Sequence, residues 1–161
     1  MVARTRADHE QTTGMRVPPS NVPSSPVPVA PVAPDAVGVL FQQADTALRA
    51  RASVKAASLL QRILTEYPSD ARGTLAQFTL GRIYLDSLGE PALAVAYFNR
   101  AIEGGVPGAL AEDAHARLVD ALARAGNRDG AASAATRYRA LYPNGRHLQD
   151  VNRCAPPVSA Q

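Results

Sequence analysis

Two helix-forming stretches of this chain end in the same way. The run LTEYPSD places Pro68 directly after Tyr67, and the run RALYPNG places Pro143 directly after Tyr142, 75 positions later. Proline has no N–H to donate to the next helical hydrogen bond, so each Tyr-Pro pair is expected to end a helix. Two such helix ends at this distance predict a repeated unit of 37 or 38 residues, present at least twice.

The segments between the turn signals carry apolar residues at helical spacing. Ala and Arg, two strong helix formers, are abundant, and β-branched residues are scarce. The sequence therefore predicts an all-α fold of three antiparallel helix hairpins, stacked as an α-solenoid, with a short C-terminal capping helix. The expected helices cover residues 39–51 and 54–67, 73–87 and 91–103, 110–125 and 129–141, and, for the cap, 146–153.

The second hairpin carries the most specific pattern. Small residues at Gly81 and Ala94 are expected to let the two helix backbones approach closely, while Tyr84 and Phe98 fill the space beside them. The order L-G-x-x-Y, then A-x-x-x-F-x-x-A, resembles the tetratricopeptide repeat (TPR) pattern. The expected structural repeat positions are Leu80, Gly81, Tyr84, Ala94, Phe98, Ala101, Pro68 and Pro143.

The length of the repeat indicates which TPR proteins this chain resembles. Long repeats whose helices end in EYP or LYP are similar to those of the outer-membrane lipoprotein BamD and the Tol-Pal-associated YbgF. Residues 75–127 resemble the TPR-type C-terminal region of bacterial FecR-type envelope regulators. The resemblance implies a protein-binding scaffold in a periplasmic or cell-envelope setting, provided that the N-terminus is incomplete. Residues 1–36 contain neither the membrane anchor nor the FecR domain of those regulators, and without a signal peptide or membrane span the sequence as it stands predicts a cytoplasmic chain.

The domain limits follow from proline content. Residues 17–36 hold seven of the 13 prolines, and proline at this density favours an extended polyproline II chain. We therefore expect a disordered N-terminal segment with a Pro-rich linker over residues 1–36, a TPR-like helical repeat domain over residues 37–153, and a disordered tail over residues 154–161.

No pattern of catalytic or metal-binding residues is found. The three histidines are scattered, and the glycine-rich run EGGVPG lacks the Lys and Ser/Thr that hold a nucleotide. Glu112, Asp113 and His115 are close in sequence, but neighbouring helical residues point in different directions and cannot share one metal ion. The sequence predicts a protein that is not an enzyme, with no cofactor, no metal and no small-molecule substrate.

The first helices of stacked hairpins line a concave groove. If Ala44, Gly81 and Val119 are equivalent, the following residue and the one four positions later face that groove. Each hairpin has one acid and one base there. This favours either i,i+4 ion pairs or a polar strip that binds a peptide or a partner helix, with Phe41 and Phe78 as apolar contacts beside it. The candidate partner-binding residues are Phe41, Asp45, Arg49, Phe78, Arg82, Asp86, Asp120 and Arg124.

Three classes of function follow. The leading one is a scaffold that binds another protein or peptide. The second is a self-associating structural module, in which arrays stack end to end as a weak homo-oligomer. Nucleic-acid binding through the Arg-rich surface is a remote alternative, because the arginines alternate with Asp and Glu at a net charge of only +3 instead of gathering on one face.

Overall fold

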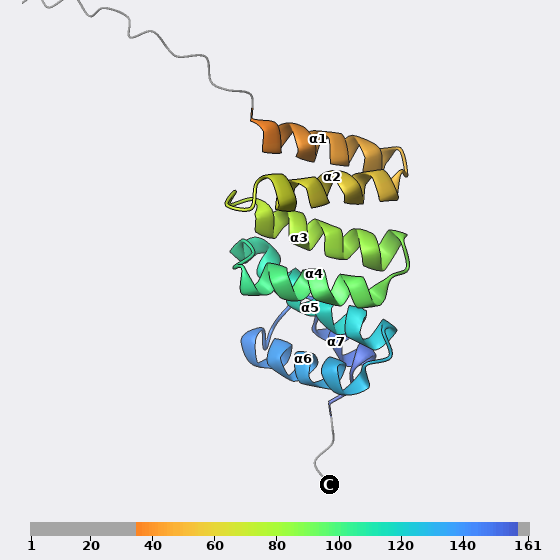
Figure 1. Cartoon of the computed structure of the whole chain (residues 1–161). Helices are drawn as coiled ribbons and strands as arrows, with labels where there is room; N and C mark the ends of the chain where they lie inside the picture. The colour runs from red at the N-terminus through yellow and green to blue at the C-terminus, as the bar shows by residue number, and fades with distance from the viewer. Residues whose placement is uncertain (1–34, 158–161) are drawn as a thin grey trace, which may run out of the picture. The chain divides into compact units, whose positions relative to one another are not determined.

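The computed structural model describes residues 35–157, and the regular elements of this part are all helical. Its helices follow one another as antiparallel pairs, α1 with α2, α3 with α4 and α5 with α6, which stack in chain order (Figure 1). The predicted all-α array of three hairpins with a C-terminal cap is confirmed. The elements are α1 (Ala36–Arg49), α2 (Ser53–Glu66), α3 (Gly73–Arg82), the π-helix η1 (Ile83–Ser87), α4 (Pro91–Glu103), α5 (Gly108–Arg124), α6 (Arg128–Leu141) and α7 (Leu148–Cys154).

The start of α1 is tied to the loop before α3. Asp35 is the N-cap of α1, and its carboxylate accepts a hydrogen bond from the first turn of the helix. Arg72 donates to both oxygens of this carboxylate, at 2.6 and 2.8 Å, and also binds Asp70. The helix consequently begins at Ala36, inside the segment predicted to be disordered. The rest of that segment, residues 1–34, lies outside the described residues.

The predicted capping helix is present as α7. It packs against α5 and α6 and buries Val151. The ordered part extends further than predicted, because Cys154 belongs to α7 and Ala155 is buried. The Arg139 guanidinium on α6 donates a hydrogen bond to the carbonyl oxygen of Ala155, which holds the end of the helix against the array. Residues 158–161 of the predicted tail lie outside the described part.

A left-handed residue joins the two helices of each hairpin. Arg51, Gly89 and Gly126 occupy these turns, with φ angles of 57°, 68° and 77°. The turns give a register in which the hairpins can be compared position by position. In each hairpin the fifth residue after the turn residue is a buried alanine of the second helix, namely Ala56, Ala94 and Ala131.

The second hairpin has one more residue than the others before its turn. Ala44 and Val119 stand seven positions before their turn residues, whereas Gly81 stands eight positions before its own. The π-helix η1 accommodates the extra residue, because hydrogen bonds from residue i to residue i+5 form a wider backbone turn. The helix predicted over residues 73–87 is therefore α-helical only as far as Arg82.

Gly81 lets α3 pack directly against the ring of Phe98. A Cβ atom at position 81 would lie 2.7 Å from this ring, closer than carbon atoms approach in folded proteins. Leu80, Ala94 and Ala101, the other predicted repeat residues of the hairpin interior, are each 0% exposed. The close helix contact expected from the sequence is present.

In the other two hairpins, the positions equivalent to Gly81 and Phe98 also hold residues that fit together in size. The position equivalent to Gly81 holds Ala44 in the first hairpin and Val119 in the third, and the position equivalent to Phe98 holds Leu60 and Ala135. All four of these residues are buried. A larger residue on one helix thus accompanies a smaller one on the other, as close packing of the interior requires.

Tyr84 fills the border between hairpins. It is half-buried, and its ring stacks on that of Tyr97 with a centroid distance of 5.3 Å. The Gln61 amide on α2 donates hydrogen bonds to both tyrosine hydroxyls, at 2.9 and 3.2 Å. Tyr84 therefore links α2 to the second hairpin as well as filling space within it.

Tyr67 and Tyr142 have the same local structure, which explains the repeated Tyr-Pro signal. Both follow the last residue of a second helix with φ of −132° and ψ of 57° and 66°, and both are half-buried. The third residue after each tyrosine, Asp70 or Gly145, donates a backbone hydrogen bond to the tyrosine carbonyl. Since α3 and α7 begin at equivalent places after these loops, α7 occupies the position of the first helix of a fourth repeat.

Replacing Gly81 with Leu should lower the free energy of unfolding by roughly 1–3 kcal/mol or more, because the new side chain overpacks the core against Phe98. A suitable control is Gly108→Ala at the start of α5, where an added Cβ meets no atom within 4 Å. Urea unfolding followed by circular dichroism measures both variants. A Gly81→Leu chain as stable as the parent would contradict this packing.

Exchanging Arg72 for Gln should flatten the loss of stability in acid. Hydrogen bonds from Arg72 lower the pKa of Asp35 from 3.8 to about 2 and also lower the pKa of Asp70. A carboxylate with a lowered pKa stabilises the fold above its ordinary pKa, and this contribution disappears as the pH falls from 3.8 towards 2. Unfolding measured across this pH range should show a steeper decline for the parent than for Arg72→Gln. Parallel curves would rule out the assigned role of Arg72.

Candidate functional site

Charged side chains of the first helices and of α7 form one surface, which we call the charged face. Contacts between elements join its part from η1 to α7, and a hollow lined by Leu48 connects α1 with the second hairpin. Asp86 of η1 binds Arg117 of α5, and Asp113 of α5 lies 3.2 Å from His147. The charged face consists of Asp45 and Arg49 on α1, Arg82 and Asp86 on α3 and η1, Asp113, Arg117, Asp120 and Arg124 on α5, and His147, Asp150 and Arg153 at α7.

Two of the three expected i,i+4 ion pairs are present. Arg49 binds Asp45 on α1 at 2.5 Å, and Arg124 binds Asp120 on α5 at 2.9 Å. Exposed pairs of this kind stabilise a protein by less than about 1 kcal/mol each. They fix the direction of the charged groups more than they contribute to stability.

The third expected pair, Arg82 with Asp86, does not form. Arg117 donates to both carboxylate oxygens of Asp86 at 3.0 Å, so this acid joins the second hairpin to the third. The extra residue accommodated by η1 is the reason. Counted back from the turn, Ser87 takes the place that Arg49 and Arg124 hold in the other hairpins. Arg82 is left without a salt bridge to any residue in the part of the chain that is described.

The two phenylalanines expected beside the polar strip lie in different surroundings. Phe78 is 2% exposed and packs against Phe98, with ring centroids 6.0 Å apart. It belongs to the core, and its prediction as a contact for a partner was wrong because its ring packs against Phe98 of α4 inside the same hairpin. Phe41 is half-buried against the core of the first hairpin.

The charged face contains two hollows. The smaller, of about 140 Å³, lies between α1 and the second hairpin and includes Leu48, Thr79, Arg82 and Asp86. The larger, of about 360 Å³, lies between α5 and α7 and includes Asp120 and Arg124 from the predicted set. Residues of the larger hollow that the sequence did not indicate are Asp113, Ala116, Arg117, His147, Asp150, Arg153 and Cys154.

The spacing of some of these additional residues in the sequence could have predicted their place on the charged face. Asp113 and Arg117 precede Asp120 by seven and three positions, which places all three on one side of α5. The partner of Arg117 lies 31 positions earlier in the chain, so the ion pair depends on how the hairpins stack. The residues of α7 join the face only because α7 packs on α5.

The larger hollow is lined by both acidic and basic side chains. Burial raises the pKa of the Cys154 thiol, and the nearby Asp120 carboxylate raises it further, so the thiol stays protonated at neutral pH. Glu112, beside this hollow, has a lowered pKa because the buried Tyr138 hydroxyl donates to it at 2.8 Å. Among residues 35–157, no group of His, Cys, Asp and Glu is arranged to hold a metal ion.

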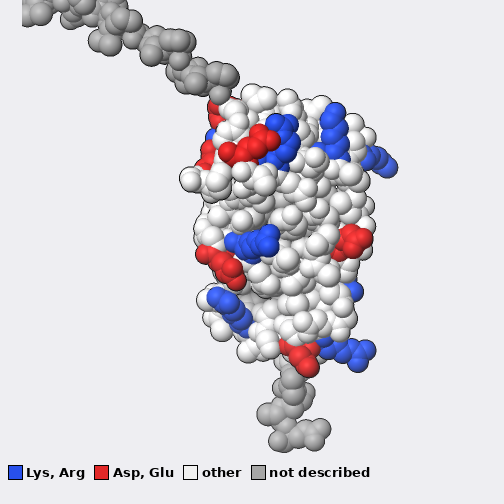
Figure 2. Space-filling model, in the orientation of Figure 1, with Lys and Arg blue, Asp and Glu red and all other residues white. Residues whose placement is uncertain are grey.

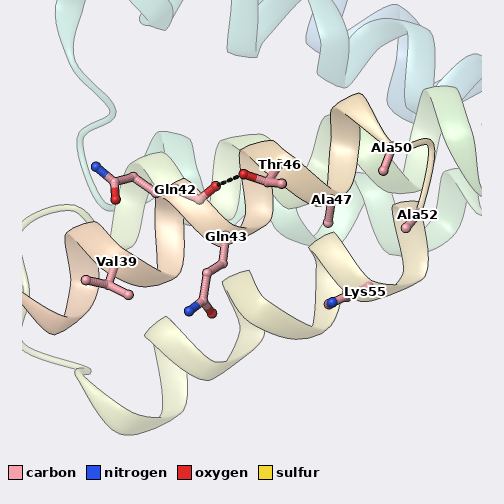
Figure 3. Close-up of a pocket in the computed structure, with 8 residues that line it drawn as sticks. All are labelled: Val39, Gln42, Gln43, Thr46, Ala47, Ala50, Ala52 and Lys55. Atoms are coloured by element: carbon pink, nitrogen blue, oxygen red, sulfur yellow. Dashed lines mark hydrogen bonds between the residues drawn. The ribbon is translucent and has the colours of Figure 1, made fainter.

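A third hollow, of about 490 Å³, lies on the outer side of the first hairpin (Figure 3). The equivalent sides of α3 and α5 are covered by the preceding hairpin. There, Leu80 and Ile83 are buried, whereas α1 has exposed Gln43 and Thr46 at the same positions. The residues around this hollow are Val39, Gln42, Gln43, Thr46, Ala47, Ala50, Ala52 and Lys55.

No helix in the described part of the chain is both long enough and apolar enough to cross a membrane. Comparison with protein families finds a tetratricopeptide repeat at residues 39–70, which cover nearly all of α1, all of α2 and the turn after it. No curated protein matches the chain. The first hairpin is thus similar to a tetratricopeptide repeat, and the two hairpins stacked on it share its helix-pair architecture.

Proposed function

We propose that this chain is a non-enzymatic scaffold that binds a peptide or a helix of another protein along the charged face. The tetratricopeptide repeat of the first hairpin supports a role in protein–protein interaction. The observation that carries the proposal is the continuity of the charged face over four helices, with hollows at its second and third hairpins.

Arg82 is the residue of this face with the strongest case for direct contact. It is exposed, it lines the smaller hollow, and its neighbours Asp86 and Arg117 are already paired with each other. A guanidinium in this setting can pair with a partner's carboxylate without breaking an internal salt bridge. Arg82 is therefore expected to contribute more to binding than to stability.

The two other function classes have less support. End-to-end association would bring together the outer side of α1, where Gln43 and Thr46 are exposed, and the opposite end of the array, which α7 covers. Nucleic-acid binding needs clustered positive charge, but Arg49, Arg117 and Arg124 are all held by aspartates. The face shown in Figure 2 likewise has no broad blue patch.

A cell-envelope assembly or signalling role in a bacterium is the biological setting we propose for this scaffold. It rests on the long repeats with Tyr-Pro helix ends, at Tyr67 and Tyr142, which resemble those of envelope proteins. Fractionation of the native cells, with detection of the endogenous protein, tests this setting separately from binding. Recovery of the protein only in the cytosolic fraction would contradict it.

Stability measurements should distinguish Arg117, which joins two hairpins, from Arg82, which is expected to bind a partner. Arg117→Ala removes the ion pair that joins two hairpins and should lower the free energy of unfolding by up to about 1 kcal/mol. Arg82→Ala removes no salt bridge within residues 35–157 and should leave stability unchanged within about 0.5 kcal/mol. Thermal unfolding of both variants is the measurement. A larger loss for Arg82→Ala than for Arg117→Ala would show that the two roles are reversed.

Binding can be tested by site-specific photocrosslinking in native cells. A photoreactive amino acid at position 79 or 82, inside the smaller hollow, should crosslink one recurring protein, and the same group at Thr136 on α6 should not. Arg82→Glu should reduce the yield of the crosslink from position 79, because the variant repels a partner's carboxylate. Equal crosslinking from α6, or a yield that Arg82→Glu leaves unchanged, would argue against binding at this face.

A further inference from the structure

A shallow apolar groove runs beside the first half of α2, outside the charged face. Its volume is about 730 Å³, and Ser87 and Leu88 of the second hairpin close one side of it. Val54 at its edge is 71% exposed, and the equivalent positions of the other hairpins hold Ala92 and Asp129. An aliphatic side chain this exposed is not explained by the core. We call this surface the α2 groove.

Positive charge surrounds the α2 groove. Arg51, Lys55 and Arg62 line it, and no acidic residue does. Arg62 is paired with Glu66, which lies outside the lining, while Arg51 and Lys55 have no salt bridge to any residue between 35 and 157. In Figure 2, blue side chains stand out over the first hairpin near its turn.

The positive surface continues around the start of α2. Lys55 and Ala52 also border the hollow in Figure 3, which likewise has no acidic residue in its lining. The first turn of α2 contains no acidic side chain, so the partial positive charge of the helix start is not neutralised there. Arg51 adds its charge at a left-handed position where the other hairpins have glycine.

We propose that the α2 groove docks an acidic segment of a partner protein through one or more aliphatic side chains flanked by Asp or Glu. The exposed Val54 with Leu59 and Leu88 offers an apolar contact, and the surrounding cations offer partners for carboxylates. Nucleic acid fits less well, because none of the residues that line the groove is aromatic and base stacking therefore has no platform. This interface borders the charged face only at Ser87 and does not require a ligand there.

Fluorescence anisotropy with labelled synthetic peptides tests the docking. The probe has a pair of leucines flanked on both sides by glutamates, and it is compared with a peptide in which lysines replace the glutamates. The full chain should bind the acidic peptide at low salt. Lys55→Glu and Val54→Ser should each weaken binding by about tenfold or more, as expected for residues at the centre of an interface.

The controls separate docking from loss of fold and from general charge effects. An acid in the first turn of a helix is favourable, so Lys55→Glu should not destabilise α2. Arg128→Glu makes the same kind of change in the first turn of α6 and should leave peptide affinity unchanged. Lys55 is the only lysine of the sequence, so an amine-reactive crosslink that maps to residue 55, and not to the α-amino group of the chain, reports on its position.

Several results would overturn the proposal. These are equal affinity for the two peptides, an equal loss of affinity in Arg128→Glu, or no loss in Val54→Ser. Binding of a labelled single-stranded oligonucleotide as tight as that of the acidic peptide would also overturn it, since charge alone would then explain the interaction. Loss of acidic-peptide binding on Arg82→Glu would assign the peptide to the charged face instead.

Discussion

The structure depends on the close approach of two helices within each hairpin. Glycine at position 81 leaves room for the ring of Phe98. At the equivalent positions, the first hairpin has Ala44 and Leu60, and the third has Val119 and Ala135. The helices are short and their interior is rich in alanine, so little apolar area is buried per residue. Stability must therefore come from dense packing within and between hairpins. Each hairpin needs the adjacent hairpin, and the last one needs the cap α7, to complete its core.

One extra residue in the second hairpin changes the surface. The π-helix η1 keeps the two helices in register with their turn, but it moves Asp86 away from Arg82 and towards Arg117. A local pair within one helix is thereby replaced by an ion pair between hairpins, and Arg82 is left without a salt bridge to any described residue. Irregular helical turns are often found at functional sites, and here the irregularity determines which charge is available to a partner.

The described surface offers two chemically different regions. On the charged face five aspartates accompany five arginines and His147, and most of them are paired, which suits a polar partner held by exchange of ion pairs. Around the start of α2, cations border apolar side chains without any acid. The two regions lie mostly on different helices and meet at the end of η1, where Ser87 borders a hollow of each. A scaffold with two such regions is consistent with a role in bringing proteins together.

Within residues 35–157, the sequence alone determined the order of the hairpins, the close contact of Gly81 with Phe98 and the helix ends at the Tyr-Pro pairs. These features depend on local periodicity, on chain-breaking residues and on side-chain size. It also indicated the two ion pairs within α1 and α5, whose partners are one helical turn apart. Only the tertiary structure decided that Phe78 is buried, that Asp86 bonds to Arg117 and that α7 brings His147 and Arg153 to the charged face. Those contacts join residues from different hairpins, and they follow from how the helices stack, which no short-range pattern records.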